Sequence, residues 1–291
     1  MSADRTHART TDPAREGRLV EIDGRPALRF ERRYAHPIER VWRAVTEPDE
    51  LSSWFPAAVV GDRAVGATLR FDDDAQRAAA HDAGEPTRAD GPELTGRVVV
   101  VDPPNVFSFT WGPELLRFEL APDGDGTLLT FTQVLSHRSV AARNGAGWHV
   151  CLQELDRLLG EPADGPDEGF AVYDDYVARI GPAPGVPGPD GSMTWERGHH
   201  VSPDVVRAAV EGDLAAWGAE AHAHEPLEWE VTADGTGTVI RLTHRGIGDD
   251  AELAATWHAL LLQLDMHLAA GQLLPADPDD FVATYRALLR T

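Results

Sequence analysis

Two stretches of the chain place apolar residues along one face of a helix, and both use the same spacing. In GWHVCLQELDRLL, Gly147 to Leu159, apolar side chains recur every three or four residues from Trp148 onward. This is the 3.6-residue period of an α-helix. TWHALLLQLDMHL, Thr256 to Leu268, repeats the pattern, and its Trp-His pair lies 109 residues further along the chain. Both stretches are therefore predicted to be amphipathic helices.

An alternating apolar pattern precedes each of these helices. LRFELAPDGDGTLLTFT (116–132) and LEWEVTADGTGTVIRLT (227–243) each place two alternating segments around an Asp-Gly turn, which predicts a β-hairpin. Further upstream, LRFERRYAHPIERVWRAVTEPDELSSWF is echoed by MTWERGHHVSPDVVRAAVEGDLAAWG. Because order and spacing hold across both halves, we interpret the second half as an internal copy of the first. In this alignment Trp195, Trp217, Trp229 and Trp257 correspond to Phe30, Trp54, Phe118 and Trp148.

The two copies differ in the middle and are joined by a Pro/Gly-rich stretch. Between Trp54 and Leu116 the first half has about four strands' worth of chain that the second half lacks. The joining stretch, GPAPGVPGPDG, suits a semi-rigid spacer and excludes a helix or a central strand. The predicted organisation is a disordered tail (1–20), a first domain (21–180), a linker (181–191) and a truncated copy (192–291).

In the first half, the elements follow the order of an α+β domain. A strand at ALRFERRYA leads into two short helices broken at EPDE. Short alternating segments then follow as ATLRFD, GRVVVVD, VFSFTW, LLRFEL and TLLTFTQV, which predicts an antiparallel meander. The Ala/Gly/Asp-rich stretch from Asp73 to Pro92 is predicted to be a mobile loop, and a long helix from Ser139 to Leu159 closes the domain. The predicted fold is one helix lying across one curved sheet.

Charge and composition exclude several classes of function. The net charge is −22, and all 26 basic residues are arginines. An acidic protein of this kind is repelled by phosphate backbones, so nucleic-acid binding is not expected. Without lysine there is no Schiff base, no anchor for pyridoxal phosphate and no P-loop lysine.

The cysteine content and the lack of long apolar segments indicate where in the cell the protein is expected. The single cysteine, Cys151, lies on the apolar helix face and reads as a small core residue, so no disulfide framework exists. The N-terminal residues lack the apolar core of a signal peptide, and no apolar run is long enough to cross a membrane. The protein is expected to be cytoplasmic, with no membrane insertion.

Several spaced motifs of the first half resemble a known superfamily. They are PIERVWRAVTEPDELSSWF, GRVVVVDPPNVFSFTW, GTLLTFTQ after a glycine turn, and GWHVCLQELDRLL. Over residues 26–180 the chain resembles the SRPBCC (START-like, helix-grip) superfamily, and within it the activator of Hsp-90 ATPase homologue-like family. The resemblance implies a six- or seven-stranded sheet that grips the C-terminal helix around an apolar cavity. Family members bind or act on lipids, polyketides and other apolar molecules.

The resemblance also implies a strand order for the truncated copy. In helix-grip folds the first strand lies beside the last, and the last lies beside the penultimate. The second half would keep SMTWERGHH beside GTVIRLTH beside LEWEV, under its own helix. It would enclose no cavity, and LEWEV would be a bare edge. We therefore expect an accessory lobe that docks on the first domain or on another chain.

Eleven residues of the first half are predicted to line the apolar pocket. Most are aromatic residues that alternation or helical spacing directs to one face, and ordinary core packing is the alternative for each of them. They are Trp54, Phe55, Phe71, Phe107, Phe109, Trp111, Phe118, Phe131, Trp148, His149 and Leu152.

Histidines of the second half raise the question of a metal site. A His-x-His pair on a strand would place both rings on one face, as zinc requires. The pair in AHAHEP falls in a predicted loop and has no cysteine partners. We therefore predict no metal and no cofactor. The histidines concerned, with one neighbouring carboxylate, are His199, His200, His222, His224, Glu225 and His244.

The leading functional hypothesis is a non-catalytic protein that binds an apolar small molecule such as a lipid, a polyketide or an aromatic compound. It rests on the helix-grip pattern and on the absence of a recognisable catalytic motif. The first alternative is an enzyme of the polyketide cyclase type, with His149 and Arg117 as candidates, although alternation directs Arg117 outward. The second alternative is partnership with a chaperone. It is disfavoured because the separate N-terminal domain of the Hsp-90 activator, with its Asn/Trp-rich motif, has no counterpart in this sequence.

Overall fold

The computed structural model describes residues 15–72, 95–162, 169–181, 183–199, 201–211, 227–233, 238–270 and 276–290. The chain divides into two compact units. The first takes residues up to 73, 92–134 and 143–178, and the second takes 74–91, 135–142 and 179–291. Most of the predicted tail and the predicted loop from Asp73 to Pro92 lie outside the described residues.

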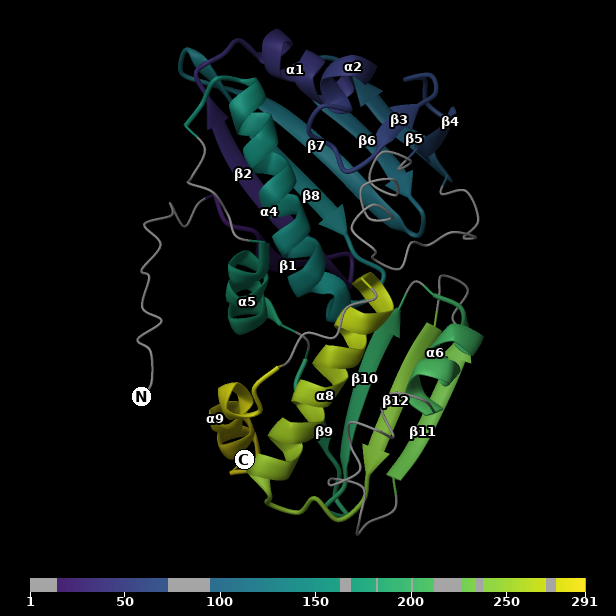
Figure 1. Cartoon of the computed structure of the whole chain (residues 1–291). Coiled ribbons are helices and arrows are strands. Elements are labelled where there is room, and N and C mark those ends of the chain that lie inside the picture. The colour runs from purple at the N-terminus through teal and green to yellow at the C-terminus, as the bar shows by residue number, and fades with distance from the viewer. Residues whose placement is uncertain are drawn as a thin grey trace. The chain divides into compact units, whose positions relative to one another are not determined.

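The first unit is an antiparallel sheet with one long helix across its face (Figure 1). The strand order is β1-β2-β8-β7-β6-β5-β4-β3. The first long strand, β2, therefore lies beside β8, and β8 lies beside β7, in the order that the resemblance implies. The α+β helix-grip fold is confirmed. The strands are β1 (Arg18–Ile22), β2 (Arg25–Tyr34), β3 (Ala58–Val60), β4 (Thr68–Asp72), β5 (Thr95–Asp102), β6 (Val106–Trp111), β7 (Glu114–Asp123) and β8 (Gly126–Val134).

Two short helices follow β2, as predicted. They are α1 (Ile38–Thr46) and α2 (Pro48–Leu51). The chain breaks between them at Glu47, which has an extended backbone, because a proline disfavours helical geometry in the residue before it. Trp54 follows α2 and is held by a 2.8 Å hydrogen bond from its indole N–H to the carbonyl of Ala44.

The long helix of the first unit is α4 (Ala141–Leu158), and α5 (Gly169–Ile180) follows it. The helix begins at Ala141 and not at Ser139, because Arg138–Val140 form a single 3₁₀ turn. It buries Trp148, Leu152 and Leu155 completely or nearly so. Burial of each leucine contributes about 2 kcal/mol relative to an exposed position.

The sheet has eight strands, whereas the resemblance implied six or seven. The strands not foreseen from the sequence are β1 and the three-residue β3. Residues 18–20, which the sequence analysis assigned to a disordered tail, are therefore part of the sheet. A two-residue turn at Asp23 and Gly24 connects β1 to β2, and both residues have the positive φ that such a hairpin turn requires.

The second unit is a smaller α+β structure with strand order β11-β12-β10-β9. The predicted order of its three long strands is confirmed, with β11 at the edge. A long helix, α8, lies across this sheet, and α9 lies beside α8 (Figure 1). No helix in the described part of the chain is long and apolar enough to span a membrane. The elements are β9 (Val186–Pro187), β10 (Met193–His199), α6 (Pro203–Ala209), β11 (Leu227–Ala233), β12 (Thr238–His244), α8 (Ala251–Ala270) and α9 (Asp279–Leu288).

The predicted linker, 181–191, contributes to the second unit. Val186 and Pro187 pair with β10 as the edge strand β9. Proline is compatible with this position because an edge strand leaves one side of its backbone without a strand partner. Just before β9, the backbone N–H of Gly185 donates to the hydroxyl of Tyr285 at 2.8 Å. The second unit therefore begins before residue 192.

Candidate functional site

The predicted lining residues gather between α4 and the face of the large sheet. Phe107 and Phe109 share one face of β6, as alternation predicts, and Trp148 of α4 packs on Phe131 of β8 with 4.6 Å between ring centroids. Neighbouring rings of the group lie no more than 6.3 Å apart. The prediction that these aromatic side chains lie close together is therefore correct. Whether they line a ligand pocket stays a prediction.

The deeper half of this group has the character of a packed core. Phe107, Phe109, Phe118 and Phe131 have no exposed surface. Phe118 stacks on Phe131 with 4.9 Å between centroids. Trp54 packs edge-on against Phe118, and Leu152 is also fully buried.

The other half, which we call the rim cluster, consists of Phe55, Phe71, Trp111 and Trp148. Trp111 contacts the other three rings, with centroid distances of 5.2 Å to Phe55 and 5.7 Å to both Phe71 and Trp148. Three of the four rings are buried, whereas Trp111 keeps part of its surface in solvent. Trp111 ends β6, so the rim cluster lies at one end of that strand and reaches the surface.

A buried polar network adjoins the rim cluster. The indole N–H of Trp148 donates to the side-chain carbonyl of Gln133 at 2.7 Å. The Gln133 amide N–H in turn donates to the carboxylate of Glu114, and Asn144 of α4 donates to the same carboxylate oxygen at 3.3 Å. Gln133 is 1% exposed and Glu114 is 5% exposed. This network fixes the position of the Trp148 ring.

This network was not predicted from the sequence, although strand alternation contains the signal. Glu114 lies two residues before Leu116 on β7, and Gln133 lies two residues after Phe131 on β8. Side chains two apart on a strand share a face. Both polar residues are therefore on the face that carries the aromatic cluster.

The indole nitrogen of Trp111 is buried and has no hydrogen-bond acceptor among the described residues. The other two indoles of the aromatic group are satisfied, Trp54 by a backbone carbonyl and Trp148 by Gln133. A buried donor without an acceptor costs about 1–3 kcal/mol and is rare in native proteins. The Trp111 N–H is therefore the polar group of this cluster that no described residue satisfies.

His149, also predicted to line the pocket, is buried and hydrogen-bonded to other groups. Its Nδ1 lies 3.3 Å from the hydroxyl of Tyr176 on α5, and its Nε2 lies 3.2 Å from the Gln153 amide. The Tyr176 hydroxyl also accepts the backbone N–H of Gly17 at 2.8 Å. These bonds tie α4, α5 and the chain before β1 together, which is a structural role.

Arg117, named for the enzyme alternative, lies on the outer part of β7. Its guanidinium donates to Glu119 at 2.9 Å, and a third of its side chain is exposed. The outward orientation expected from alternation is confirmed.

A buried ionic cluster that the sequence analysis did not foresee surrounds Asp156 of α4. Its carboxylate accepts hydrogen bonds from Arg32 at 3.3 Å, from the hydroxyl of Tyr34 at 2.9 Å, and from Arg15. Asp156 and Arg32 are almost completely buried. Burial, followed by the charge of Asp156, raises the pKa of Tyr34 well above its usual value. Tyr34 therefore stays protonated and donates to Asp156.

The second unit contains a related cluster. Asp265 of α8 lies 3.3 Å from Arg197 and 3.3 Å from His199, both of β10. Tyr285 of α9 accepts the Gly185 N–H and lies 2.9 Å from Nδ1 of His258.

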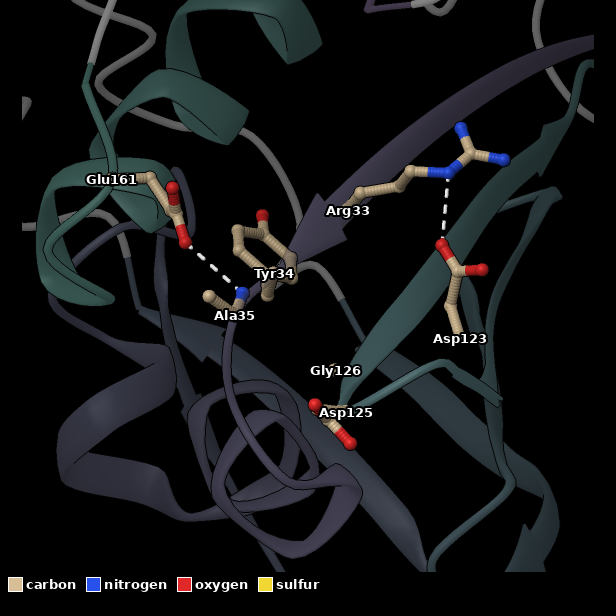
Figure 2. Close-up of a pocket in the computed structure, with 7 residues that line it drawn as sticks. All are labelled: Arg33, Tyr34, Ala35, Asp123, Asp125, Gly126 and Glu161. Carbon is tan, nitrogen blue, oxygen red and sulfur yellow. Dashed lines mark hydrogen bonds and ion pairs between the residues drawn. The ribbon is translucent and has the colours of Figure 1, made fainter.

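A surface pocket of about 410 Å³ lies elsewhere on the first unit (Figure 2). Within it, Arg33 pairs with Asp123 at 2.9 Å, and Glu161 accepts the backbone N–H of Ala35 at 3.1 Å (Figure 2). None of the predicted lining residues belongs to it. The pocket is lined by Arg33, Tyr34, Ala35, Asp123, Asp125, Gly126 and Glu161.

The predicted absence of a metal site is tested only in part. No group of three or more His, Cys, Asp or Glu side chains within the described ranges could hold a metal ion. His200, His222, His224 and Glu225 lie outside the described residues. Burial raises the pKa of the Cys151 thiol to about 12, which disfavours the reactive thiolate form.

Comparison with known proteins identifies one family model. The model of the activator of Hsp90 ATPase homolog 1-like protein matches residues 35–160. No curated protein sequence matches the chain.

Solved structures also resemble the chain. The crystal structure of CalU16 from Micromonospora echinospora is 19% identical, covers 55% of this chain and 89% of its own, and has a TM-score of 0.39. A protein of Bordetella parapertussis, the product of gene BPP1335, is 25% identical over 59% of this chain and 96% of its own, with a TM-score of 0.42. MLL2253 from Mesorhizobium loti is 26% identical over 46% and 96%, with a TM-score of 0.37.

Proposed function

We propose that the first unit binds an apolar, aromatic small molecule at the rim cluster and does so without catalysis. The observation that carries this proposal is the buried indole N–H of Trp111, which no described residue accepts, within a group of aromatic rings. The helix-grip fold and the family match over residues 35–160 are compatible with a ligand-binding domain.

The partial exposure of Trp111 supports this location. Of the eleven predicted lining residues, Trp111 is the one that is half-buried and the other ten are buried. A ligand that packs against Trp111 displaces water from its exposed surface and gains contacts with Phe55 and Phe71. The Gln133–Glu114 network holds Trp148 in place, so the far side of the cluster is already organised before binding.

A thermal-shift screen with fatty acids, aromatic polyketides and flavonoids tests the proposal. A ligand present at a hundred times its Kd stabilises the folded protein by about 2.7 kcal/mol, which is a readily measured shift in Tm. The stabilisation should disappear in Trp111→Ala. It should persist in Trp42→Ala, a control in which a half-buried tryptophan of α1 that contacts Phe107 is removed. The absence of a shift with every compound would refute the proposal.

Glu114 provides the specific observation behind the enzymatic alternative. A buried carboxylate beside an aromatic cluster is a possible general acid or base. A cyclase would require Glu114 to reach the ligand, whereas a binding protein requires only that it support Gln133. Glu114→Gln distinguishes the two. Turnover of an aromatic polyketide by the wild type that is lost in the variant, with binding retained, would favour the enzyme.

We also propose that the second half is a truncated internal copy of the first. The strand registers support this, because Leu28 pairs with Gln133 as the aligned Met193 pairs with His244. Four contacts that involve side chains also recur, three at aligned positions and one between an aligned tyrosine and a glycine just before each sheet. The glycine contacts are Gly17–Tyr176 and Gly185–Tyr285, both at 2.8 Å, and the same tyrosines contact histidines, as Tyr176–His149 at 3.3 Å and Tyr285–His258 at 2.9 Å. The ionic contacts are Arg32–Asp156 and Arg197–Asp265, both at 3.3 Å. The threonine contacts are Thr127 to the His36 carbonyl and Thr238 to the Val201 carbonyl, both at 2.7 Å.

The copy lacks the strands that carry the rim cluster. Phe55, Phe71 and Trp111 lie on or beside β3, β4 and β6, and the second sheet has no equivalents of these strands among its described residues. We infer that the second unit is an accessory lobe without a ligand site of its own. Its docking on the first unit or on a second chain stays a prediction. Docking on a second copy of the chain would double the mass of the full-length protein in solution, which can be measured.

A further inference from the structure

We infer that β11, the outer strand of the second sheet, accepts one more antiparallel strand from another protein, and that this strand alternates apolar and basic residues. Figure 1 shows β11 as the outermost strand of its sheet, beside β12. This edge belongs to the second unit, so it is independent of the ligand site proposed for the first.

The four edge strands of the two described sheets differ in how well they are protected against further pairing. β3 and β9 have only three and two residues, and β9 contains Pro187. β1 has five residues. β11 has seven, with neither proline nor glycine, and it pairs with β12 without a bulge. Short strands, prolines and bulges are the usual means of blocking an edge, and β11 uses none of them.

The core-facing side chains of β11 are less well covered than their counterparts in the first unit. Leu227, Trp229 and Val231 pack on the core of the second unit but are only half-buried. In the proposed alignment they correspond to the three apolar residues in LRFEL of β7, which are at most 4% exposed. β7 lies between β8 and β6, whereas β12 is the one strand beside β11 among the described residues. A further strand at β11 would therefore remove apolar surface from water.

The pairing of β6 with β7 indicates which residues an added strand would present to β11. Phe107 of β6 lies opposite the β7 residue that aligns with Trp229. Phe109 lies opposite the one that aligns with Leu227. Apolar residues, and aromatic ones above all, are therefore expected at alternate positions of the added strand.

The other face of β11 determines the polar residues of the partner. Glu228 and Glu230 lie on this face, in a network of ion pairs that has four carboxylates and two guanidinium groups. The network therefore has an excess of negative charge. Opposite charges that face each other on neighbouring strands contribute about 0.2–1 kcal/mol per pair, so arginine or lysine fits opposite each of the two glutamates. The members of the network are Asp190, Glu196, Glu228, Glu230, Arg241 and Arg245.

A second copy of this chain fits the edge less well than a basic strand. In an antiparallel pair of two β11 strands centred on Trp229, each Glu228 would face a Glu230. A pair centred on Glu230 would place the two copies of this residue opposite each other. Like charges in such positions destabilise a sheet, and the net charge of −22 also opposes association of two copies.

One backbone group of β11 has a partner outside the sheet. The carbonyl of Val231 accepts from the guanidinium of Arg207 on α6 at 3.4 Å, which is long for a hydrogen bond. Arg207 also donates to Asp204 at 2.9 Å. It keeps this second partner if an added strand takes the carbonyl.

A synthetic peptide tests this inference with the full-length protein. The peptide is acetyl-Thr-Val-Arg-Phe-Arg-Phe-Thr-amide, whose arginines fall opposite Glu230 and Glu228 in the register that β6 has on β7. Its Kd is measured by the fluorescence anisotropy of a labelled form. We expect this peptide to bind more tightly than a form with glutamates in place of the arginines.

Two variants of the protein locate the site. Glu230→Gln should weaken binding about two- to fivefold, because one cross-strand charge pair is lost. Arg241 keeps its ion pair with Glu196 in this variant. Glu119→Gln is the matched control, because Glu119 aligns with Glu230 but lies on β7, which has a strand on each side. It should leave the Kd unchanged.

Backbone pairing has two readouts that need no variant of the protein. The peptide should slow hydrogen exchange at alternate amides of β11 and leave those of the edge strand β1 unchanged. Two further forms of the peptide are N-methylated at its odd or at its even residues. Because only alternate N–H groups of a strand face its neighbour, one form should bind and the other should not.

Each other result would overturn the inference in a distinguishable way. If the arginine peptide does not bind, or binds no better than the glutamate form, the proposed partner is wrong. Equal binding of the two N-methylated forms would exclude strand addition. If the amides of β11 are protected without peptide, the edge is already covered, by this chain if the protein is a monomer and by a second copy if its mass is doubled.

Discussion

At the scale of single residues, the charged groups inside the two units matter more to the fold than those on the surface. Asp156 is enclosed with two arginines, whereas Asp123 forms an exposed pair with Arg33. A charge in the interior is stable only when a partner balances it. An Asp–Arg pair therefore matters more to stability in the interior, as at Asp156, than on the surface, as at Asp123.

Asp156→Asn should destabilise the protein by about 3–5 kcal/mol, because it leaves the buried guanidinium of Arg32 without its counter-charge. Urea unfolding measures the change. Asp123→Asn is the matched control and should cost no more than about 1 kcal/mol, since both side chains of its pair are largely exposed. Similar losses in the two variants would contradict a structural role for the buried cluster.

His258 should make the stability of the protein sensitive to acid. Burial, together with the positive charges of Arg197 and Arg138, lowers its pKa from 6.5 to about 3. His258 binds its proton near pH 6.5 in the unfolded chain and only near pH 3 in the folded protein. The contribution of His258 is therefore complete above about pH 6.5 and is lost as the pH falls toward 3, by about 1.4 kcal/mol per pH unit.

Urea unfolding between pH 7 and pH 4 measures this loss. His258→Gln removes the titrating group and keeps an acceptor for Tyr285. The stability advantage of the wild type over the variant should shrink as the pH falls. Parallel pH profiles for the two proteins would show that His258 is not the group responsible.

At the scale of helices and strands, alternation and helical spacing predicted most of the fold. The pair α1 and α2, the long strands and the helices α4 and α8 were visible in the sequence because each contains enough residues to show a period. The strands β3 and β9 have three and two residues, which is too short for a period to be recognised. β1 was missed although the Asp23-Gly24 turn marks its hairpin, because the residues before it resemble a polar tail.

The candidate site could be predicted only in part, for a physical reason. Aromatic residues are recognised one by one, so Phe71 and Trp111 could be proposed as lining residues from the sequence. Their division into core and rim depends on which ring reaches solvent, which is decided by packing across several strands. Glu114 and Gln133 were missed because polar residues on a strand are expected to face water. Their hydrogen bonds to each other make burial possible.

The hydrogen bonds that connect the chain before each sheet to its last helix suggest a paired test. Tyr176→Phe leaves the N–H of Gly17 without its acceptor, and Tyr285→Phe does the same for Gly185. Each substitution should cost about 1–3 kcal/mol. Tyr285→Phe also removes the acceptor of the Trp195 indole N–H, which donates to this hydroxyl at 2.6 Å.

Urea unfolding measures the loss of stability in each variant. Hydrogen exchange of the two glycine amides adds a local readout. Each amide should exchange faster only in the variant of its own tyrosine. If both glycine amides exchanged at the wild-type rate in both variants, these hydrogen bonds would have no measurable value.

At the scale of the whole molecule, the two units differ in how large a sheet each contains. The first has eight strands and the aromatic cluster, and the second has four strands and a core of its own. Its sheet is solvated on the face away from α8, where Arg241 bonds to Glu196 and Glu230 on the neighbouring strands. A lobe of this size buries a small core, so each contact at its ends has a large share in its stability.

The second unit should therefore depend on the residues just before it. A fragment of residues 192–291 loses β9, the Gly185 bond to Tyr285 and the carbonyl of Ala183 that accepts from Arg197. We expect this fragment to be insoluble or to lack a cooperative thermal transition. A fragment of residues 179–291 restores these contacts and should show more protection in hydrogen exchange along α8. A stable monomer of residues 192–291 that melts cooperatively would show that the lobe folds without them, and it would reopen the histidines of the second half as a possible site.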